Sequence, residues 1–222
     1  MSPGRRTPRR RKRERPIPDL ILVRHAPTSW SGRRYCGRAD PPLTRAGTAV
    51  ATRLAADLVS RVVPGLVGID GRAIRIVCSP ARRARQTARA IAHVVPGARV
   101  EIDDRWAEAD VGFAEGRTFD ELRAMAPELA ARLLSGDPAI DWPGGESASA
   151  LAERVSAAWL DLCQATLPAI VVSHAGPLRI AVGLASDLPI ESVPFLEPGA
   201  FVHLPSPGGS GVDPGRMLRF RL

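Results

Sequence analysis

Basic side chains follow three short apolar runs of the sequence. Arg24 and His25 end the first, "LILVRH"; Arg83 follows the second, "AIRIVCS"; and His174 ends the third, "AIVVSH". A guanidinium group offers forked N–H donors to the oxygens of a phosphate, and a neutral imidazole can attack phosphorus at physiological pH. Two arginines and two histidines at one place would therefore suit the binding and cleavage of a phosphate ester.

These four side chains can meet only if the three runs are strands of one sheet. Apolar runs alternate along the chain with segments of helical periodicity, which predicts strands at 20–23, 73–79, 98–103 and 169–174. Helices are predicted at 45–63, from Ser79-Pro80 through Ile91, after Thr118, after "GGES" (144–147) and near 177–186. "GAFVHL" and "RMLRFRL" are the predicted closing strands, joined by a Gly/Pro-rich turn at 206–215.

This order of elements is typical of an α/β domain: a three-layer α/β/α sandwich with a mostly parallel central sheet. Ligands of such sheets bind outside the carboxyl ends of the strands. The spacing therefore predicts that Arg24, His25, Arg83 and His174 meet at one crevice there.

Two consecutive helices with no strand between them are expected in the middle of the chain. Thr118 and Glu121 have the T-x-x-E spacing of a capping box, ahead of a helix with Leu122, Met125, Leu129 and Leu133 on one face. The second helix follows "GGES". We therefore expect one domain over 18–222, with a helical cap at about 117–166 beside the site.

The N-terminal segment differs in composition from the rest of the chain. The net charge is +8, and residues 1–15 hold eight basic residues and one acidic residue, so the remainder is nearly neutral. A polar, basic, proline-containing segment favours disorder, and this one lacks the apolar region of a signal peptide. Residues 1–17 are therefore predicted to form a disordered tail, either solvated or in contact with nucleic acid.

Composition excludes several other kinds of site. The three cysteines are widely spaced with no CxxC, and the four histidines form no HxxxH or HExxH pattern. This argues against a disulfide framework and a metal site, and it favours the cytoplasm. No apolar stretch approaches the roughly 20 residues of a membrane-spanning helix, so no membrane partner is expected.

Six segments, in this order, resemble motifs of the histidine phosphatase superfamily, the group containing cofactor-dependent phosphoglycerate mutases and many acid phosphatases. They are "LVRHAPT", "YCGRADPPLTRAG", "CSPARRARQTA", "WAEADVGFAEG", "PGGES" and "VVSHAGPLR", and they span roughly residues 20–186. The departures are small: Ala26 and Ala175 stand where glycine is frequent, and Ser31 where asparagine is common.

The resemblance implies a role for each residue at these motif positions. His25 would form a phosphohistidine intermediate, while Arg24, Arg83 and a protonated His174 would neutralise the phosphate. No metal and no other cofactor would take part.

The resemblance also implies that Glu108, in "WAEADVG", is the proton donor. Burial by Trp106 and Val111 would have to raise its pKa for this duty. Asp110 and Glu115 are the alternative acids.

Turn residues at the same end of the sheet are further candidates. Thr28, Ser31, Cys36 and Gly37 are predicted to line the pocket through hydroxyl and backbone N–H groups. Glu146 in "PGGES" either reaches the site or interacts with the helix dipole. The predicted ligand is a small-molecule phosphate ester, and a homodimer stays open.

Three functions follow as alternatives. The first is a metal-independent phosphomonoesterase acting on small phosphorylated metabolites. "YCGRADPPL" looks like α-ribazole-5′-phosphate phosphatases, and it also suits broad-specificity enzymes. The second is a phosphotransferase of the phosphoglycerate-mutase type, and the third is a non-catalytic binder of anions or nucleic acid. The first is favoured because Glu108 and both histidines are present, and because 117–147 holds only Arg117, Arg123 and Arg132 as basic residues.

Overall fold

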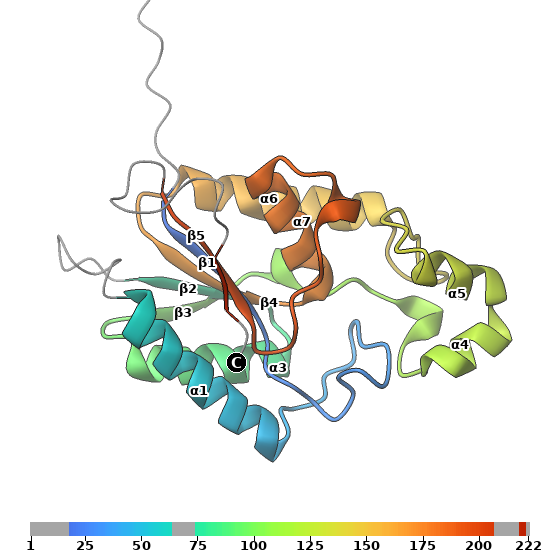
Figure 1. Cartoon of the computed structure of the whole chain (residues 1–222), viewed down its shortest axis with the longest axis horizontal. Coiled ribbons are helices and arrows are strands. Elements are labelled where there is room, and N and C mark those ends of the chain that lie inside the picture. Colours follow the sequence, from blue (N-terminus) through green and yellow to red (C-terminus); the bar gives the residue numbers. More distant parts are fainter. Residues whose placement is uncertain (1–17, 64–73, 207–217, 221–222) are drawn as a thin grey trace, which may run out of the picture.

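The computed structural model describes residues 18–63, 74–206 and 218–220, and it centres on a six-stranded sheet (Figure 1). The strands are β1 (Leu20–Arg24), β2 (Arg75–Cys78), β3 (Arg99–Ile102), β4 (Ala169–Ser173), β5 (Phe201–Leu204) and β6 (Leu218–Phe220). Their order is β3-β2-β4-β1-β5-β6. The first four are parallel, and β5 and β6 run antiparallel to their neighbours. The predicted fold class is confirmed.

Helices cover both faces of this sheet. In Figure 1, α1 (Arg45–Arg61) and α3 (Arg82–Val94) lie below it, and α6 (Ala148–Gln164) and α7 (Ala175–Ser186) lie above it. Alternate side chains of a strand point to opposite faces. Ile21 and Val23 accordingly belong to the core between the sheet and α1 and α3. Leu20 and Leu22 belong to the core between the sheet and α6 and α7. Strand β1 is thus buried on both sides, which fixes the position of the residues that follow it.

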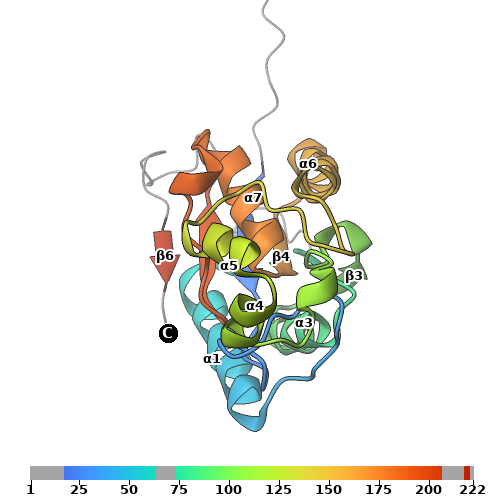
Figure 2. The ribbon, with the colours of Figure 1, turned by 90° about the vertical axis from the view of Figure 1, so that its right-hand side faces the viewer.

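The first of the two middle helices is in fact two. α4 (Phe119–Met125) and α5 (Pro127–Leu134) lie together at the right-hand end of the molecule in Figure 1, the end that faces the viewer in Figure 2. The chain breaks at Ala126, whose φ of −144° and ψ of 71° are not helical. A residue that precedes proline is disfavoured in the helical region, and Pro127 here opens α5. Met125, predicted to share one helix face with Leu122, is 57% exposed, whereas Leu122 is buried.

The segment for which a cap is predicted, 117–166, divides between two environments. α4 and α5 form a small core of their own with the adjoining loops. α6 instead packs against the sheet, because Val155, Ala158, Trp159 and Leu162 are buried in the same core as β1 and β4. The helices that stand off the sheet are therefore α4 and α5, and α6 is part of the outer layer.

Local signals at helix starts give mixed results. Thr44, Ser147 and Thr118 cap α1, α6 and α4 with their side chains, and the capping box with Glu121 is present. The prediction that Ser79-Pro80 begins a helix is wrong, because α3 begins at Arg82 after the N-cap residue Ala81. The tail at 1–17 and most of the turn at 206–215 lie outside the described residues. None of the helices in the described ranges is long and apolar enough to cross a membrane.

Candidate active site

The predicted residues meet at the carboxyl ends of the parallel strands. Arg24 ends β1 and His25 follows it, His174 follows β4, and Arg83 lies in the first turn of α3 after β2. A cavity of about 1150 Å³ opens at this edge, and Arg24, His25, Arg83 and Glu108 line it. Three of the four predicted basic residues therefore line a crevice at the expected edge, whereas His174 is fully buried and does not line it.

His25 is held in one tautomer by the backbone. Its Nδ1 lies 2.8 Å from the carbonyl oxygen of Ala26, which can only accept a hydrogen bond. Nδ1 therefore carries the proton, and Nε2 carries a free lone pair. Burial, and then the positive charge of Arg83, lower the pKa of His25 to about 3. The ring is thus neutral at ordinary pH, as a nucleophile must be.

The backbone conformation at position 26 does not require glycine. The φ of Ala26 is not in the left-handed region, and the backbone N–H of this residue donates to Thr87 Oγ1 at 3.0 Å. The buried Thr87 hydroxyl in turn donates to the carbonyl of Arg83. This links the nucleophile's loop to α3.

His174 lies next to His25 and is fully buried. The two ring centres are 5.0 Å apart with an edge-on orientation, and His174 Nε2 lies 2.7 Å from Ser79 Oγ. Within the part of the chain that the structure describes, His174 Nδ1 has no partner. Burial, followed by the charges of Arg83 and His25, holds the pKa of His174 well below its ordinary value. The predicted protonated form therefore needs a compensating negative charge, such as a phosphate dianion.

The two arginines differ in how they are held. Arg24 donates from Nη1 to the carbonyl of Leu196 at 2.5 Å. Arg83 is almost completely buried and donates from Nη1 to the carbonyl of Ala39 at 2.7 Å and from Nη2 to that of Gly37 at 3.1 Å. The Nε atoms of both arginines have no partner among the described residues. Each guanidinium is anchored by the protein and still carries donors for an anion.

Of the three candidate proton donors, Glu108 lines the cavity, and Asp110 and Glu115 do not. The Glu108 carboxylate accepts from the N–H groups of Ala109, at 3.0 Å, and Gly176, at 3.3 Å. Burial raises the pKa of Glu108 above its ordinary value, although these amides and the charges of Arg24 and Arg83 oppose the shift. A Cβ at position 176 would lie 2.7 Å from Glu108 Oε1, so glycine lets the amide approach the carboxylate.

The carboxylates of the two alternative acids, Asp110 and Glu115, accept hydrogen bonds from backbone N–H groups of the loops. Asp110 accepts from the N–H of Gly112, and Glu115 accepts from the N–H groups of Gly37 and Arg38. These contacts explain both residues without a catalytic role.

The pocket residues predicted from turns fall into two groups. Thr28, Ser31 and Cys36 line the cavity. Gly37 does not, and the prediction that its N–H faces a ligand is wrong, because that N–H donates to Glu115 Oε1 at 3.0 Å. Burial raises the pKa of Cys36 to about 11, although Arg83 opposes this, so the thiol stays protonated.

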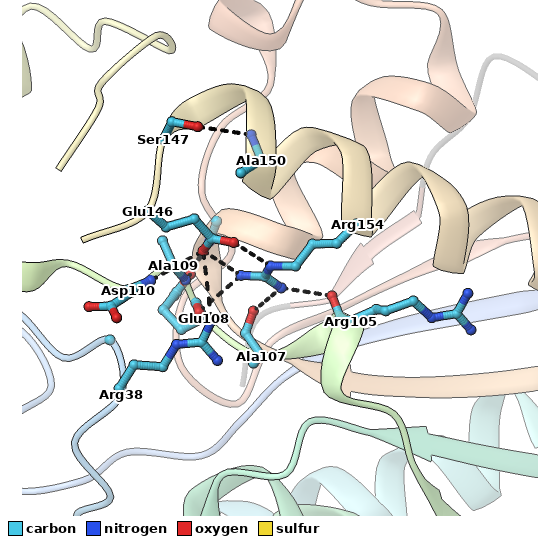
Figure 3. Close-up of polar contacts among 12 residues, drawn as sticks. Arg38, Arg105, Ala107, Glu108, Ala109, Asp110, Glu146, Ser147, Ala150 and Arg154 are labelled. Carbon is cyan, nitrogen blue, oxygen red and sulfur yellow. Dashed lines mark hydrogen bonds and ion pairs between the residues drawn. The ribbon is translucent and has the colours of Figure 1, made fainter. Parts of the chain in front are cut away.

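Arg154, on α6, organises the loop that carries Glu108, and sequence reasoning missed it (Figure 3). Its guanidinium binds both oxygens of Glu146, at 2.6 and 2.8 Å. It also donates to the carbonyls of Arg105, Ala107 and Glu108 at 2.8, 2.7 and 3.1 Å. Glu146 is therefore a partner of this arginine rather than a site residue. The two lie eight positions apart on different elements, so no spacing rule pairs them.

Replacing Arg154 with alanine is expected to lower the free energy of unfolding by about 3 kcal/mol, because it leaves the Glu146 carboxylate poorly solvated and without its main partner. Urea titration monitored by circular dichroism measures this. Arg123→Ala is the matched control, since Arg123 forms an exposed ion pair with Asp120 and should change stability by less than about 0.5 kcal/mol. Equal, small effects of both substitutions would contradict the structural role of Arg154.

Ser79 was also missed as a site residue. The Ser-Pro pair that follows β2 resembles a helix start, but the buried Ser79 hydroxyl contacts His174 and accepts from the N–H of Ala81 at 3.2 Å. Within the described ranges, no group of three or more His, Cys, Asp or Glu side chains could hold a metal ion.

Known proteins are similar to this chain over about three quarters of its length. The chain is 34% identical over 171 residues to a bifunctional protein of Mycobacterium tuberculosis, a match that covers 76% of this chain but 44% of that protein. The chain thus spans less than half the length of that relative. It is also 33% identical over 175 residues to a probable phosphoglycerate mutase of Photorhabdus laumondii, covering 77% of this chain and 75% of that one.

A solved structure supports the same relationship. The chain superposes on the mycobacterial glucosyl-3-phosphoglycerate phosphatase with a TM-score of 0.69 and 25% identity, over 84% of this chain and 89% of the other. Residues 20–200 match the sequence model of the histidine phosphatase superfamily, branch 1. The chain belongs to branch 1 of the histidine phosphatase superfamily.

Proposed function

We propose that this protein is a metal-independent phosphomonoesterase that acts on small phosphorylated metabolites through a phosphohistidine intermediate. The observation that carries this proposal is the tautomer of His25: the Ala26 carbonyl holds the proton on Nδ1 and leaves a lone pair on Nε2. This ring lines the cavity together with Arg24, Arg83 and Glu108.

In the first step, His25 Nε2 attacks phosphorus, the N–P bond forms and the bond to the ester oxygen breaks. Glu108 gives its proton to the departing alkoxide. Arg24 and Arg83 neutralise the non-bridging oxygens, and His174, once protonated beside the dianion, adds a third positive charge.

In the second step, a water molecule attacks the phosphorus of phosphohistidine. Glu108, now ionised, accepts a proton from that water. The N–P bond breaks, inorganic phosphate leaves, and His25 and Glu108 return to their starting protonation states. The raised pKa of Glu108 suits this exchange of roles, because a carboxyl with an ordinary pKa would rarely hold the proton.

Hydrolysis is favoured over phosphotransfer by the basic residues of 117–147. A mutase must hold a second anionic group of its substrate, but none of the three arginines in this segment lines the cavity. Arg117 lies over the ring of Phe113, Arg123 pairs with Asp120, and Arg132 pairs with Asp137. Each is explained by a contact within the protein.

The natural substrate is left open within this class, and α-ribazole 5′-phosphate is one candidate. We place the activity in the cytoplasm, since the three cysteines are unpaired and suit a reducing compartment.

The test is an assay of 3-phosphoglycerate with a bisphosphoglycerate primer, and of a panel of phosphomonoesters, in excess EDTA. We expect phosphate release from the panel and little 2-phosphoglycerate, because water is the acceptor and no metal is needed. Mutase turnover far above hydrolysis would favour the phosphotransferase. Activity lost in EDTA and restored by a divalent ion would contradict the metal-independent mechanism. Tight anion or nucleic-acid binding without any turnover would favour the non-catalytic binder.

A further inference from the structure

The cavity is much larger than a phosphate group requires. Its volume of about 1150 Å³ is above the range of roughly 300–1,000 Å³ typical of pockets for whole small molecules. The phosphate-binding residues are contributed by the strand ends and α3. The rest of the wall comes from the loop after β1 (28–36), from the cap helices and the loop that follows them, from α6 and α7, and from the segment after α7. This second part must contact the alcohol portion of a phosphate ester.

That part of the wall is predominantly apolar and rich in aromatic rings. Its side chains include those of Trp30, Tyr35, Phe119, Trp142, Ile180 and Phe195. At the mouth, Leu134, Leu184 and Leu188 are exposed to solvent although they are apolar. Exposed apolar residues that gather around a cavity are typical of a ligand-binding surface. Small residues on α6, Ala148 and Ala152 among them, also line this part of the cavity.

Charged residues also line this part of the wall, and three of them contact other parts of the protein. Arg179 donates to the carbonyl of Val193 at 2.8 Å and lies over the ring of Phe195. Arg34 donates to the carbonyl of Gly116, and Asp137 pairs with Arg132. Arg34 and Arg179 each keep further N–H donors, and the rest of this wall, which is mostly apolar, offers contact area to the alcohol portion.

We infer that the substrate is a phosphomonoester whose alcohol carries a large aromatic group, and that this group binds between the cap and α6–α7. The inference rests on the proposed function. Burying an aromatic group releases apolar surface from water, and its binding also contributes to the transition state, so it raises kcat/KM.

A matched pair of esters tests this without interference from the leaving group. 2-(1-Naphthyl)ethyl phosphate and ethyl phosphate both release a primary alkoxide, and they differ in the aromatic group. We expect kcat/KM to be on the order of 10² higher for the naphthyl ester, the gain that burial of about 100 Å² of apolar surface supplies. Equal values for both esters would overturn the inference.

Two variants show whether the preference arises in this cavity. Ala152→Trp fills the space beside α6, and Ala157→Trp is its control on the exposed face of the same helix. Leu184→Gln makes the mouth polar, and Leu160→Gln is its control: these leucines are 46% and 56% exposed, and Leu160 does not line the cavity. Each test variant should reduce the naphthyl-to-ethyl ratio about tenfold or more and leave ethyl phosphate turnover nearly unchanged. The controls should leave both unchanged.

The outcomes separate this inference from the function on which it rests. If neither ester releases phosphate, the phosphomonoesterase proposal fails. If both release phosphate at the same rate, or if both test variants leave the ratio at the wild-type value, the enzyme stands and the aromatic substrate class is wrong. If Ala152→Trp does not fold, the decision rests on Leu184→Gln, whose exposed position makes its folding cost small.

Discussion

Replacing His25 with alanine is expected to lower phosphate release by a factor on the order of 10⁴ or more, because the variant has no group at the position of Nε2 that can attack phosphorus. Steady-state release of inorganic phosphate from an alkyl ester measures the effect. The cavity and its arginines remain in this variant, so substrate binding should persist while turnover is lost.

His93→Ala is the matched control for this substitution. His93 lies in the last turn of α3 and is exposed, and it does not line the cavity. Its replacement should leave turnover unchanged. A His25→Ala enzyme within tenfold of the wild type would assign the chemistry to another group.

Replacing Glu108 with glutamine is expected to slow the cleavage of alkyl phosphates by a factor of about 10²–10⁴, the usual contribution of a general acid. Nitrophenyl phosphate should lose much less in the phosphorylation step, because its leaving group departs without a proton. Rapid-mixing measurements of alcohol and nitrophenol release compare the two. Glu153→Gln, an exposed position on α6, is the control. An equal loss for both esters in that step would rule out Glu108 as the proton donor.

The pH dependence of kcat/KM should differ between the wild-type enzyme and the Glu108→Gln variant. Burial raises the pKa of Glu108, so its protonated, active form persists to higher pH than for an ordinary carboxyl. As pH rises through that raised pKa, the acid is lost and kcat/KM for alkyl esters falls. The Glu108→Gln enzyme should lack this fall, since glutamine does not titrate. The substrate's own ionisation is common to both enzymes, so the difference between the profiles reports Glu108.

The site was largely predictable because its parts follow the ends of apolar strands. Arg24, His25 and His174 need no long-range information: the run before each is a buried strand, and parallel strands present their carboxyl ends at one edge. Glu108 is different. It lies on a loop between two short 3₁₀ turns, and the motif resemblance rather than any periodicity pointed to it.

The features that sequence reasoning missed depend on contacts between distant segments. Arg154 is an ordinary polar residue of α6 until the fold brings Glu146 and three loop carbonyls to it. The N–H of Gly37, predicted to line the pocket, instead donates to Glu115, which is 78 positions away in the sequence. The break before Pro127 is local, by contrast, and the proline was a signal that the apolar spacing of Leu122, Met125 and Leu129 concealed.

The most direct test of the account is to trap the phosphorylated enzyme. Enzyme mixed with a ³²P-labelled phosphomonoester and quenched in alkali within milliseconds should carry acid-labile, alkali-stable label, and peptide mapping should place that label on His25. The label should form and decay at rates that account for turnover, and it should be absent from the His25→Ala enzyme. Turnover without any labelled enzyme, or label on a residue other than His25, would contradict the phosphohistidine mechanism.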